Sequence, residues 1–425
     1  MLFFLGALHA LMALSCSSTP QPRNGEIVVP QDFFGMVHAG ETESNEEYAL
    51  IDEMGISWIS YTFYWHRIEK ERGRLDFSWY DNFVDAAKSK GKKIVAVLGY
   101  EADWLYPEGK SKKYIGKEDI PLFLNFVEET VRHFEGRVDA WEIWNEPNFM
   151  FWAGRDNEFF DLTRQAAQRI RGTAPDALIL GGAFWRVPKG FIKGMHKAGA
   201  MENLDGLAFH PYAASPARVM KLHDNFLKIL SGLNYQGSVW ITEIGYPSSG
   251  WFPIRVSLEE LPSHVVKTIT GAAARGTRAL LWYELFDSYN EGEVPPGTRN
   301  SEKFFGLAYP NLGRKNGAWA YELCARYLPG SRYRSDLPMM ENIKSSIASF
   351  CFMNGASGNN TLILWNDRDS VQKAKLRLAA PALLHDISSG RSRALQEDAL
   401  IDIGKEPLFI TWQGTETPKI FMEKQ

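Results

Sequence analysis

Apolar runs alternate with amphipathic stretches over most of the chain. Between about residues 33 and 326, short runs of β-branched and aromatic residues are separated by segments with apolar residues at three- and four-residue spacing. This pattern is typical of βα units around a parallel sheet. Helices are predicted at, for example, 79–89 and 120–134. The predicted strands are 34–38, 57–61, 93–99, 140–144, 177–181, 206–210, 238–243 and 279–284.

Eight such repeats predict an α/β fold of the (β/α)8 TIM-barrel type over residues 31–330. The main alternative is a doubly wound open sheet. That fold normally begins with a glycine-rich phosphate loop, and no G-x-G-x-x-G motif follows an early strand. The pattern therefore favours the barrel.

The pattern of apolar and polar residues changes after residue 330. Short alternating segments at 361–365, 373–378 and 407–412 are separated by turn-forming clusters. We predict a small antiparallel β domain, sandwich-like, over residues 331–425. Residues 17–30 form either a linker or an N-terminal strand, and a strand near 26–29 could complete the sandwich.

The first 16 residues form an apolar run that is too short to span a bilayer and is followed by polar residues. We interpret residues 1–16 as an export signal, although no Lys or Arg precedes the apolar core. The sequence Ala-Leu-Ser-Cys at 13–16 also resembles a lipoprotein processing site. The protein is therefore expected to be exported, and either secreted (or periplasmic) or attached to the membrane of the cell envelope through lipidated Cys16.

Charge and cysteine content exclude some classes of partner. The formal charge of −4 comes from well-mixed acids and bases, so a nucleic-acid partner is not expected. Neither a metal nor a cofactor is expected, since metal-ligand spacings such as Cys-x-x-Cys are missing from the sequence. Cys324 and Cys351 either pair or remain buried free thiols.

Two segments end in a glutamate where a predicted strand stops. WEIWNEPN contains Glu146 and WITEIGYP contains Glu243. Since the active site of a barrel forms at the carboxyl ends of its strands, these side chains should converge. Paired carboxylates are the groups that cleave glycosidic bonds. Other polar and aromatic side chains at predicted strand ends are His38, Trp65, Glu101, His210, Tyr212, Trp282 and Glu284.

These motifs resemble those of the clan of retaining glycoside hydrolases that carry acid and nucleophile on strands four and seven. The resemblance extends from about residue 34 to 328, and the layout is similar to family 39 and to neighbouring branches of family 5. It implies that Glu146 is the general acid/base, preceded by the clan's Asn145, and that Glu243 is the nucleophile. His210 and Tyr212 match the strand-six pair. Trp282 matches the tryptophan beside the substrate.

The resemblance implies a retaining β-glycosidase that acts on an oligosaccharide or polysaccharide. Tyr212 would hydrogen-bond Glu243, and Asn145 would reach the 2-hydroxyl of the sugar. The charge of Glu243 would raise the pKa of Glu146. We expect further substrate contacts from Trp65, His38, Glu101 and Glu284, with pairing to Arg67 as the alternative for both glutamates.

One position departs from the clan. The arginine that commonly braces the nucleophile from strand two corresponds here to Ser60. Ser60 supports an alternative class, a barrel that binds carbohydrate with little or no turnover. A metal-dependent barrel hydrolase ranks last, because it needs histidines and aspartates clustered at strand ends. Glu142 is expected to be a structural acid lower in the barrel, and His66 is either structural or a ligand.

The connecting loops carry further aromatic residues. We expect two or three of five tryptophans to form sugar subsites: Trp65, Trp104, Trp152, Trp185 and Trp251. The insertion at 287–303 would either wall off one end of the site or line an open cleft. Whether the small β domain binds glycan is left open by its sequence.

Overall fold

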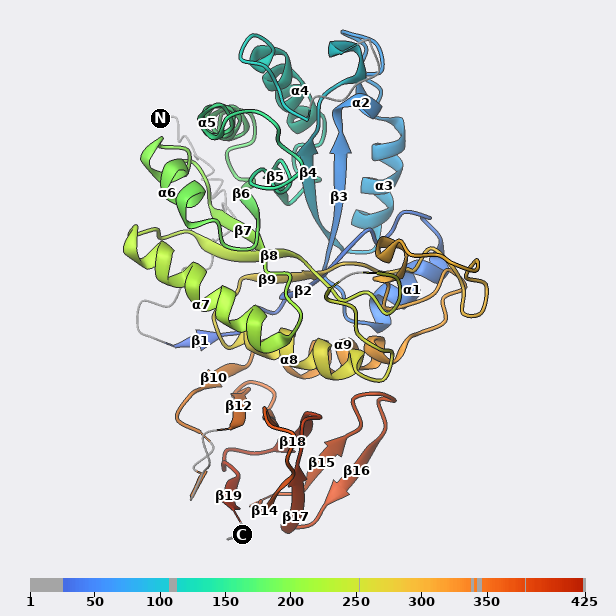
Figure 1. Cartoon of the computed structure of the whole chain (residues 1–425), viewed down its shortest axis with the longest axis vertical. Coiled ribbons are helices and arrows are strands. Elements are labelled where there is room, and N and C mark those ends of the chain that lie inside the picture. Colours follow the sequence, from blue (N-terminus) through green and yellow to red (C-terminus); the bar gives the residue numbers. More distant parts are fainter. Residues whose placement is uncertain are drawn as a thin grey trace, which may run out of the picture.

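The structure is a computed structural model that describes residues 26–106, 113–251, 253–337, 340–341, 346–378 and 380–422. Within these residues a barrel with its surrounding helices forms the larger part, and a β module lies against one side of it (Figure 1). The predicted leader, including Cys16, lies outside the described residues.

Eight parallel strands close into a barrel in sequence order, which confirms the predicted fold. The last strand pairs with the first through Phe34 and Leu280. The fifth predicted strand, 177–181, extends to Trp185 in the structure, because a register shift between Gly181 and Phe184 lets it continue past the glycines. The strands are β2 (Phe34–Val37), β3 (Trp58–Tyr64), β4 (Lys93–Gly99), β5 (Ala140–Ile143), β6 (Leu178–Trp185), β7 (Gly206–His210), β8 (Ser238–Ile244) and β9 (Ala279–Trp282).

Helices surround the barrel because each buries one apolar face on the strands. In α4, for example, Phe123, Phe126 and Val127 are fully buried. The two helices predicted as examples each agree with the structure to within one residue. The helices are α1 (Asn45–Glu53), α2 (Trp65–Ile68), α3 (Ser78–Ser89), α4 (Ile120–His133), α5 (Asp156–Thr173), α6 (Lys189–Lys197), α7 (Pro216–Gly232), α8 (Leu261–Ala273) and α9 (Asn316–Tyr327), with 3-10 turns η1 (Asp103–Leu105) and η2 (Ser301–Phe304).

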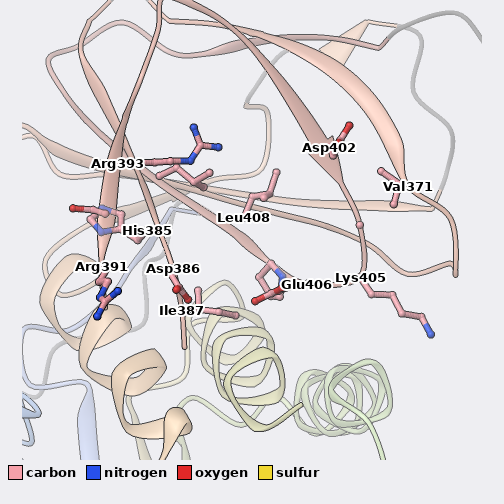
Figure 2. Close-up of a pocket in the computed structure, with 14 residues that line it drawn as sticks. Val371, His385, Asp386, Ile387, Arg391, Arg393, Asp402, Lys405, Glu406 and Leu408 are labelled. Atoms are coloured by element: carbon pink, nitrogen blue, oxygen red, sulfur yellow. The ribbon is translucent and has the colours of Figure 1, made fainter. Parts of the chain in front are cut away.

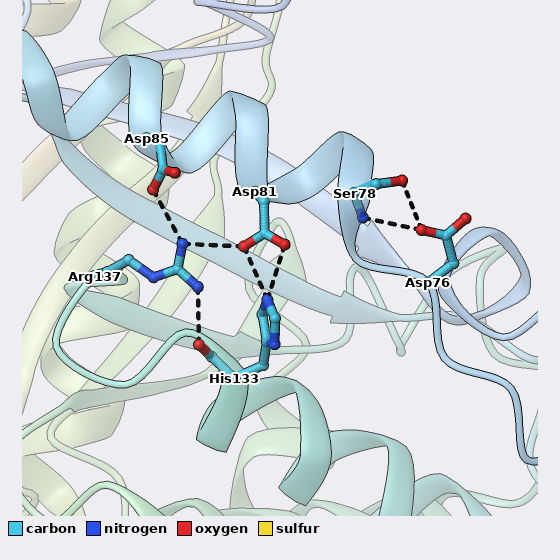
Figure 3. Close-up of polar contacts among 6 residues, drawn as sticks. All are labelled: Asp76, Ser78, Asp81, Asp85, His133 and Arg137. Atoms are coloured by element: carbon cyan, nitrogen blue, oxygen red, sulfur yellow. Dashed lines mark hydrogen bonds and ion pairs between the residues drawn. The ribbon is translucent and has the colours of Figure 1, made fainter.

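Polar contacts join α3 to the end of α4 (Figure 3). Asp81 contacts His133 at 2.8 Å, and Arg137 lies 3.0 Å from both Asp81 and Asp85. Such part-exposed pairs contribute little to stability. They connect α3 to the end of α4 and the turn that follows it.

The C-terminal part is a two-sheet module. One sheet has the order β1-β10-β12-β13-β18-β15-β16 and the other β11-β19-β14-β17, with an apolar core between them. The expected N-terminal strand, β1, pairs antiparallel with β10. The strands are β1 (Ile27–Val28), β10 (Arg332–Arg334), β11 (Met340–Glu341), β12 (Ile347–Met353), β13 (Asn359–Asn366), β14 (Gln372–Arg377), β15 (Ala382–His385), β16 (Ser392–Leu395), β17 (Asp398–Ile403), β18 (Leu408–Gln413) and β19 (Lys419–Met422).

The β module packs on the barrel through apolar side chains. Tyr327 at the end of α9 lies 5.1 Å from the His385 ring and 6.1 Å from the Phe409 ring, between ring centroids. Phe409 and Trp365 belong to the same buried cluster as the barrel core. The module is thus joined to the helix layer of the barrel, at α9, by a shared apolar core.

Two remaining features concern thiols and membranes. Cys324 and Cys351 are buried free thiols, so the predicted alternative of a disulfide between them is wrong. Among the described residues no helix is both long and apolar enough to cross a membrane.

Candidate active site

A cavity of about 580 Å³ lies at the carboxyl ends of the barrel strands, where the sequence predicts the site. Glu146 and Glu243 both line it. Of the other predicted site residues, Asn145, His210, Tyr212 and His38 line it too. Aromatic side chains form much of the wall: Tyr61, Tyr64, Tyr100, Phe149, Phe151, Trp185, Tyr283 and Phe305.

The two predicted catalytic carboxyls lie on either side of one histidine. The Nδ1 atom of His210 is 2.8 Å from Oε1 of Glu146 and 3.8 Å from Oε2 of Glu243. Donor atoms of all three residues lie within 4.8 Å of one another. Glu146 lies three residues after the end of β5 with a φ of 41°, and Glu243 lies near the end of β8. These two strands are not adjacent in the barrel, so the pair is brought together because all strands end at the same face.

A chain of hydrogen bonds fixes the proton positions around Glu146. Thr242 donates its hydroxyl to Oε1 of Glu142 at 2.9 Å. In the tautomer that fits this donation, Thr242 accepts from Nε2–H of His210 at 3.1 Å. Burial lowers the pKa of His210, which favours a neutral ring whose Nδ1 is then an acceptor. With this tautomer a protonated Glu146 donates to Nδ1 at 2.8 Å.

The electrostatics agree with a protonated Glu146. Burial and, second, the charge of Glu302 together raise the pKa of its carboxyl from 4.5 to about 8. The expected cause, repulsion by Glu243, is not among them. Mutual repulsion acts instead on the partner, where Glu146 raises the pKa of Glu243.

The pKa of the Glu243 carboxyl is raised, first by burial and then by the charge of Glu146. His210, Tyr212 and His38 oppose that rise and so favour the anionic form. The Tyr212 hydroxyl donates to Oε1 of Glu243 at 2.7 Å, which confirms the predicted contact. The side chain of Glu243 is 22% exposed, compared with 6% for Glu146, so Glu243 is the carboxyl more open to the cavity.

The floor of the cavity is formed by Ser60 and Glu142. Ser60 lies where the clan commonly has an arginine, and its small side chain lets the cavity reach Glu142. Glu142 is 2% exposed, and burial raises the pKa of its carboxyl to about 8. Glu142 is thus a buried acid below the pair, as predicted, and it also ends the hydrogen-bond chain.

The other predicted polar contacts have local partners. His38 binds Oε2 of Glu284 through Nδ1 at 2.9 Å, so Glu284 pairs with His38 and not with Arg67. Arg67 instead donates to the Tyr61 hydroxyl at 3.3 Å. Glu284 lies behind His38, outside the cavity lining.

Three predicted substrate contacts are corrected by the structure. Trp65 is fully buried against α4, donates to Glu69 at 2.6 Å and stacks on a phenylalanine ring. Trp282 is fully buried and outside the cavity lining. Glu101 is buried and accepts from the Lys113 amide at 3.1 Å. Trp65 begins α2 and Glu101 lies in the loop after β4, so the alternation of side chains along a strand does not place either of them in the barrel interior.

Of the five loop tryptophans, Trp185 lines the cavity, fewer than the two or three expected. Its ring stacks on Phe149 with centroids 4.9 Å apart. Trp65 and Trp152 are buried, and Trp251 is 83% exposed outside the cavity lining. The indole of Trp104 donates to the Glu69 carbonyl at 2.9 Å, and Trp104 does not line the cavity.

Sequence reasoning missed Glu302. This carboxylate comes from η2, at the end of the predicted insertion 287–303, and lines the cavity. The Tyr283 hydroxyl donates to it at 3.2 Å. Glu302 is far in sequence from any predicted strand end, so the sequence pattern did not indicate that it belongs to the site.

Glu146, His210 and Glu243 are also the one group among the described residues with the spacing to hold a metal ion. Both ring nitrogens of His210 are already used, one by Glu146 and one by Thr242. Metal binding would require the hydrogen-bond chain to break, so the donor set fits proton transfer better than metal coordination.

A second hollow, of about 550 Å³, lies in the β module near the barrel helices (Figure 2). Charged side chains surround it, including Arg391, Arg393 and Lys405, and its described lining contains no Trp, Tyr or Phe. Flat aromatic faces on which a sugar could stack are therefore missing from this hollow.

Comparison with known proteins gives matches to glycoside hydrolases. A family model for β-galactosidases matches residues 37–105. A search of curated proteins gives no match.

Several solved structures share the fold. A family 39 glycoside hydrolase from Bacteroides cellulosilyticus aligns with a TM-score of 0.76 at 20% identity, over 91% of this chain and 81% of that one. A β-xylosidase from Caulobacter crescentus aligns at 0.64 and 15% identity, over 92% and 98%. A family 30 xylanase from Clostridium acetobutylicum aligns at 0.60 and 10% identity, over 91% and 97%.

These matches confirm the predicted resemblance to barrel glycoside hydrolases. At these identities the solved structures establish the shared fold. The roles of individual residues depend on the geometry of this chain.

Proposed function

We propose that the protein is a retaining β-glycosidase in which Glu243 is the nucleophile and Glu146 the general acid/base. One observation carries the proposal: the two carboxyls approach within 4.8 Å around His210. Retaining enzymes place them about 5–5.5 Å apart, whereas inverting enzymes need roughly 6.5–9.5 Å to admit a water molecule. The spacing here favours direct attack by a carboxylate.

In the first step Glu243 attacks the anomeric carbon while Glu146 gives its proton to the departing oxygen. The environments suit these roles. Glu146 is held protonated by burial and by the acceptor Nδ1 of His210, and Glu243 is the more open carboxyl. Tyr212 orients the nucleophile through its 2.7 Å bond.

In the second step water releases the sugar from Glu243. Once the glycosyl-enzyme bond forms, the charge of Glu243 is lost and Glu146 is an anion, so Glu146 can take a proton from the attacking water. Asn145 lines the cavity beside the pair. It would donate to the 2-hydroxyl, and that bond strengthens as positive charge develops at the anomeric carbon.

For the substrate we propose an oligosaccharide or polysaccharide with β-linked sugars. Two of the similar structures are described as a β-xylosidase and a xylanase, and the matching family model as β-galactosidase. Xylosides and galactosides are therefore the first substrates to test. We also propose export, which rests on the apolar run at residues 1–16; the mature N-terminus and any lipid on Cys16 can be measured by mass spectrometry of the native protein.

The test is hydrolysis of activated aryl β-glycosides by the wild type and by the variants Glu146→Ala and Glu243→Ala, with and without azide. The proposal predicts loss of activity in both variants. Azide should rescue Glu146→Ala with a β-azide product and Glu243→Ala with an α-azide product. The reverse pattern of anomers would exchange the two roles.

A specific observation favours a second candidate, a barrel that binds glycan with little turnover. Ser60 occupies the cavity floor in place of the clan's arginine. Retained glycan binding, together with no turnover of any substrate by the wild type, would support this second function and contradict the first.

A further inference from the structure

The described lining of the cavity contains four glutamates and no Lys or Arg. The glutamates are Glu142, Glu146, Glu243 and Glu302. Two arginines contact lining residues without lining the cavity themselves. Arg67 donates to the Tyr61 hydroxyl and lies over the Tyr64 ring, and Arg186 lies over the Trp185 ring.

The histidines do not supply a free positive charge. Burial lowers the pKa of His210, so its ring is neutral. His38 is paired at 2.9 Å with Glu284, and that pair has no net charge when His38 is protonated. A sugar carboxylate or sulfate in this cavity would therefore lose water without gaining a cationic partner.

Glu302 differs from the other three acids. Glu142 and Glu146 are protonated near neutral pH, and Glu243 is the proposed nucleophile, whereas Glu302 has no part in the proposed chemistry. It is exposed at the rim, faces the cavity, and receives one side-chain hydrogen bond, from Tyr283. The effect of its charge on Glu146 shows that its field reaches the reacting groups.

We propose that this site accepts uncharged glycosides and rejects those with an acidic group, and that Glu302 is the residue that sets this charge selectivity. The inference rests on the proposed glycosidase function and adds its substrate class: neutral glycans, not uronic-acid or sulfated ones. Glu302 acts on specificity by repelling an anion and by accepting hydrogen bonds from sugar hydroxyls.

The test compares kcat/KM for matched nitrophenyl β-glycosides, glucoside with glucuronide and galactoside with galacturonide. The wild type should prefer the neutral member by about 100-fold or more, since like charges brought together cost several kcal/mol. In Glu302→Gln the preference should fall by about tenfold. Glu293→Gln is the matched control, because Glu293 lies in the same insertion, is exposed, and is outside the cavity lining.

Two results would overturn the inference. Comparable turnover of acidic and neutral members by the wild type would show that the cavity does not select by charge. A preference unchanged in Glu302→Gln would show that shape excludes the acid. Either result leaves the glycosidase function intact, whereas wild-type inactivity on all neutral glycosides contradicts the glycosidase function itself.

If the wild type is inactive on all neutral glycosides, the charge effect of Glu302 can still be tested without substrate. Carboxyl carbon NMR titration should show a lower pKa for Glu146 in Glu302→Gln than in the wild type or in Glu293→Gln, since the charge that raises it is removed. An unchanged Glu146 titration would mean that the Glu302 charge does not reach the site, and the inference would fail.

Discussion

The buried acid Glu142 should make the fold less stable at alkaline pH, and Glu142→Gln should remove that effect. Burial raises the pKa of this carboxyl from 4.5 to about 8. Its contribution to stability is therefore fully present below the unfolded pKa and is lost as pH rises through the folded pKa. Gln has the same shape, carries no charge, and keeps an oxygen that accepts from Thr242.

The magnitude follows from that rise. At 1.36 kcal/mol for each pH unit, the full effect is about 5 kcal/mol. About half of it, roughly 2 to 3 kcal/mol, falls between about pH 6 and about pH 9, because the unfolded chain is already ionised at the lower pH. Glu146 contributes equally to both proteins and cancels in the comparison.

The assay is denaturant unfolding of both proteins at these two pH values. On going to the higher pH, the unfolding free energy of the wild type should fall by about 2 to 3 kcal/mol more than that of Glu142→Gln. Glu135→Gln, at an exposed position, controls for the change in net charge. Parallel pH dependence of the wild type and Glu142→Gln would refute the reasoning, since Glu142 would then not be a buried acid.

Three further outcomes are expected. The kcat/KM of the wild type should fall as pH rises through about 8, because Glu146 must be protonated to act as acid and its pKa is raised to about 8; an alkaline limb near the usual carboxyl pKa would argue against this. Tyr212→Phe should lower kcat/KM by about 10- to 100-fold, because the variant loses the 2.7 Å hydrogen bond to Glu243. Steady-state kinetics measures this change, and circular dichroism checks that the variant is folded. A decrease of less than about twofold would contradict the orienting role of Tyr212. Cys324 and Cys351 should not react with a thiol reagent until the protein is denatured, since both are buried with raised pKa values; rapid labelling of the native protein would disprove their burial.

The fold was predictable because hydrophobic period and strand-end chemistry depend on local sequence. The strands 93–99 and 206–210 agree with β4 and β7 to the residue. Glu146 and Glu243 could be found because each lies at the end of a buried strand beside a proline or glycine. His210 and Tyr212 could be predicted in the same way, because they lie at and just after the end of a buried strand.

The remaining site residues depend on where loops go and which way side chains point. Trp65 and Trp282 are aromatic residues at strand ends, yet both rings are buried, because packing against helices or neighbouring rings gains more than exposure. Glu302 lies in a long insertion whose path is set by tertiary contacts. One of them is the hydrogen bond that the backbone N–H of Trp251 donates to the Arg299 carbonyl at 2.9 Å. Such contacts leave no periodic signal in the sequence.

The most direct test of the central claim is to trap the glycosyl-enzyme. A deoxy-fluoro sugar with an activated leaving group, matched to the best aryl glycoside, should inactivate the wild type and leave its sugar on the peptide that contains Glu243, as read by mass spectrometry. The account predicts one label on Glu243 and none in Glu243→Gln. A label on another carboxylate, or turnover with inversion and no label, would contradict it.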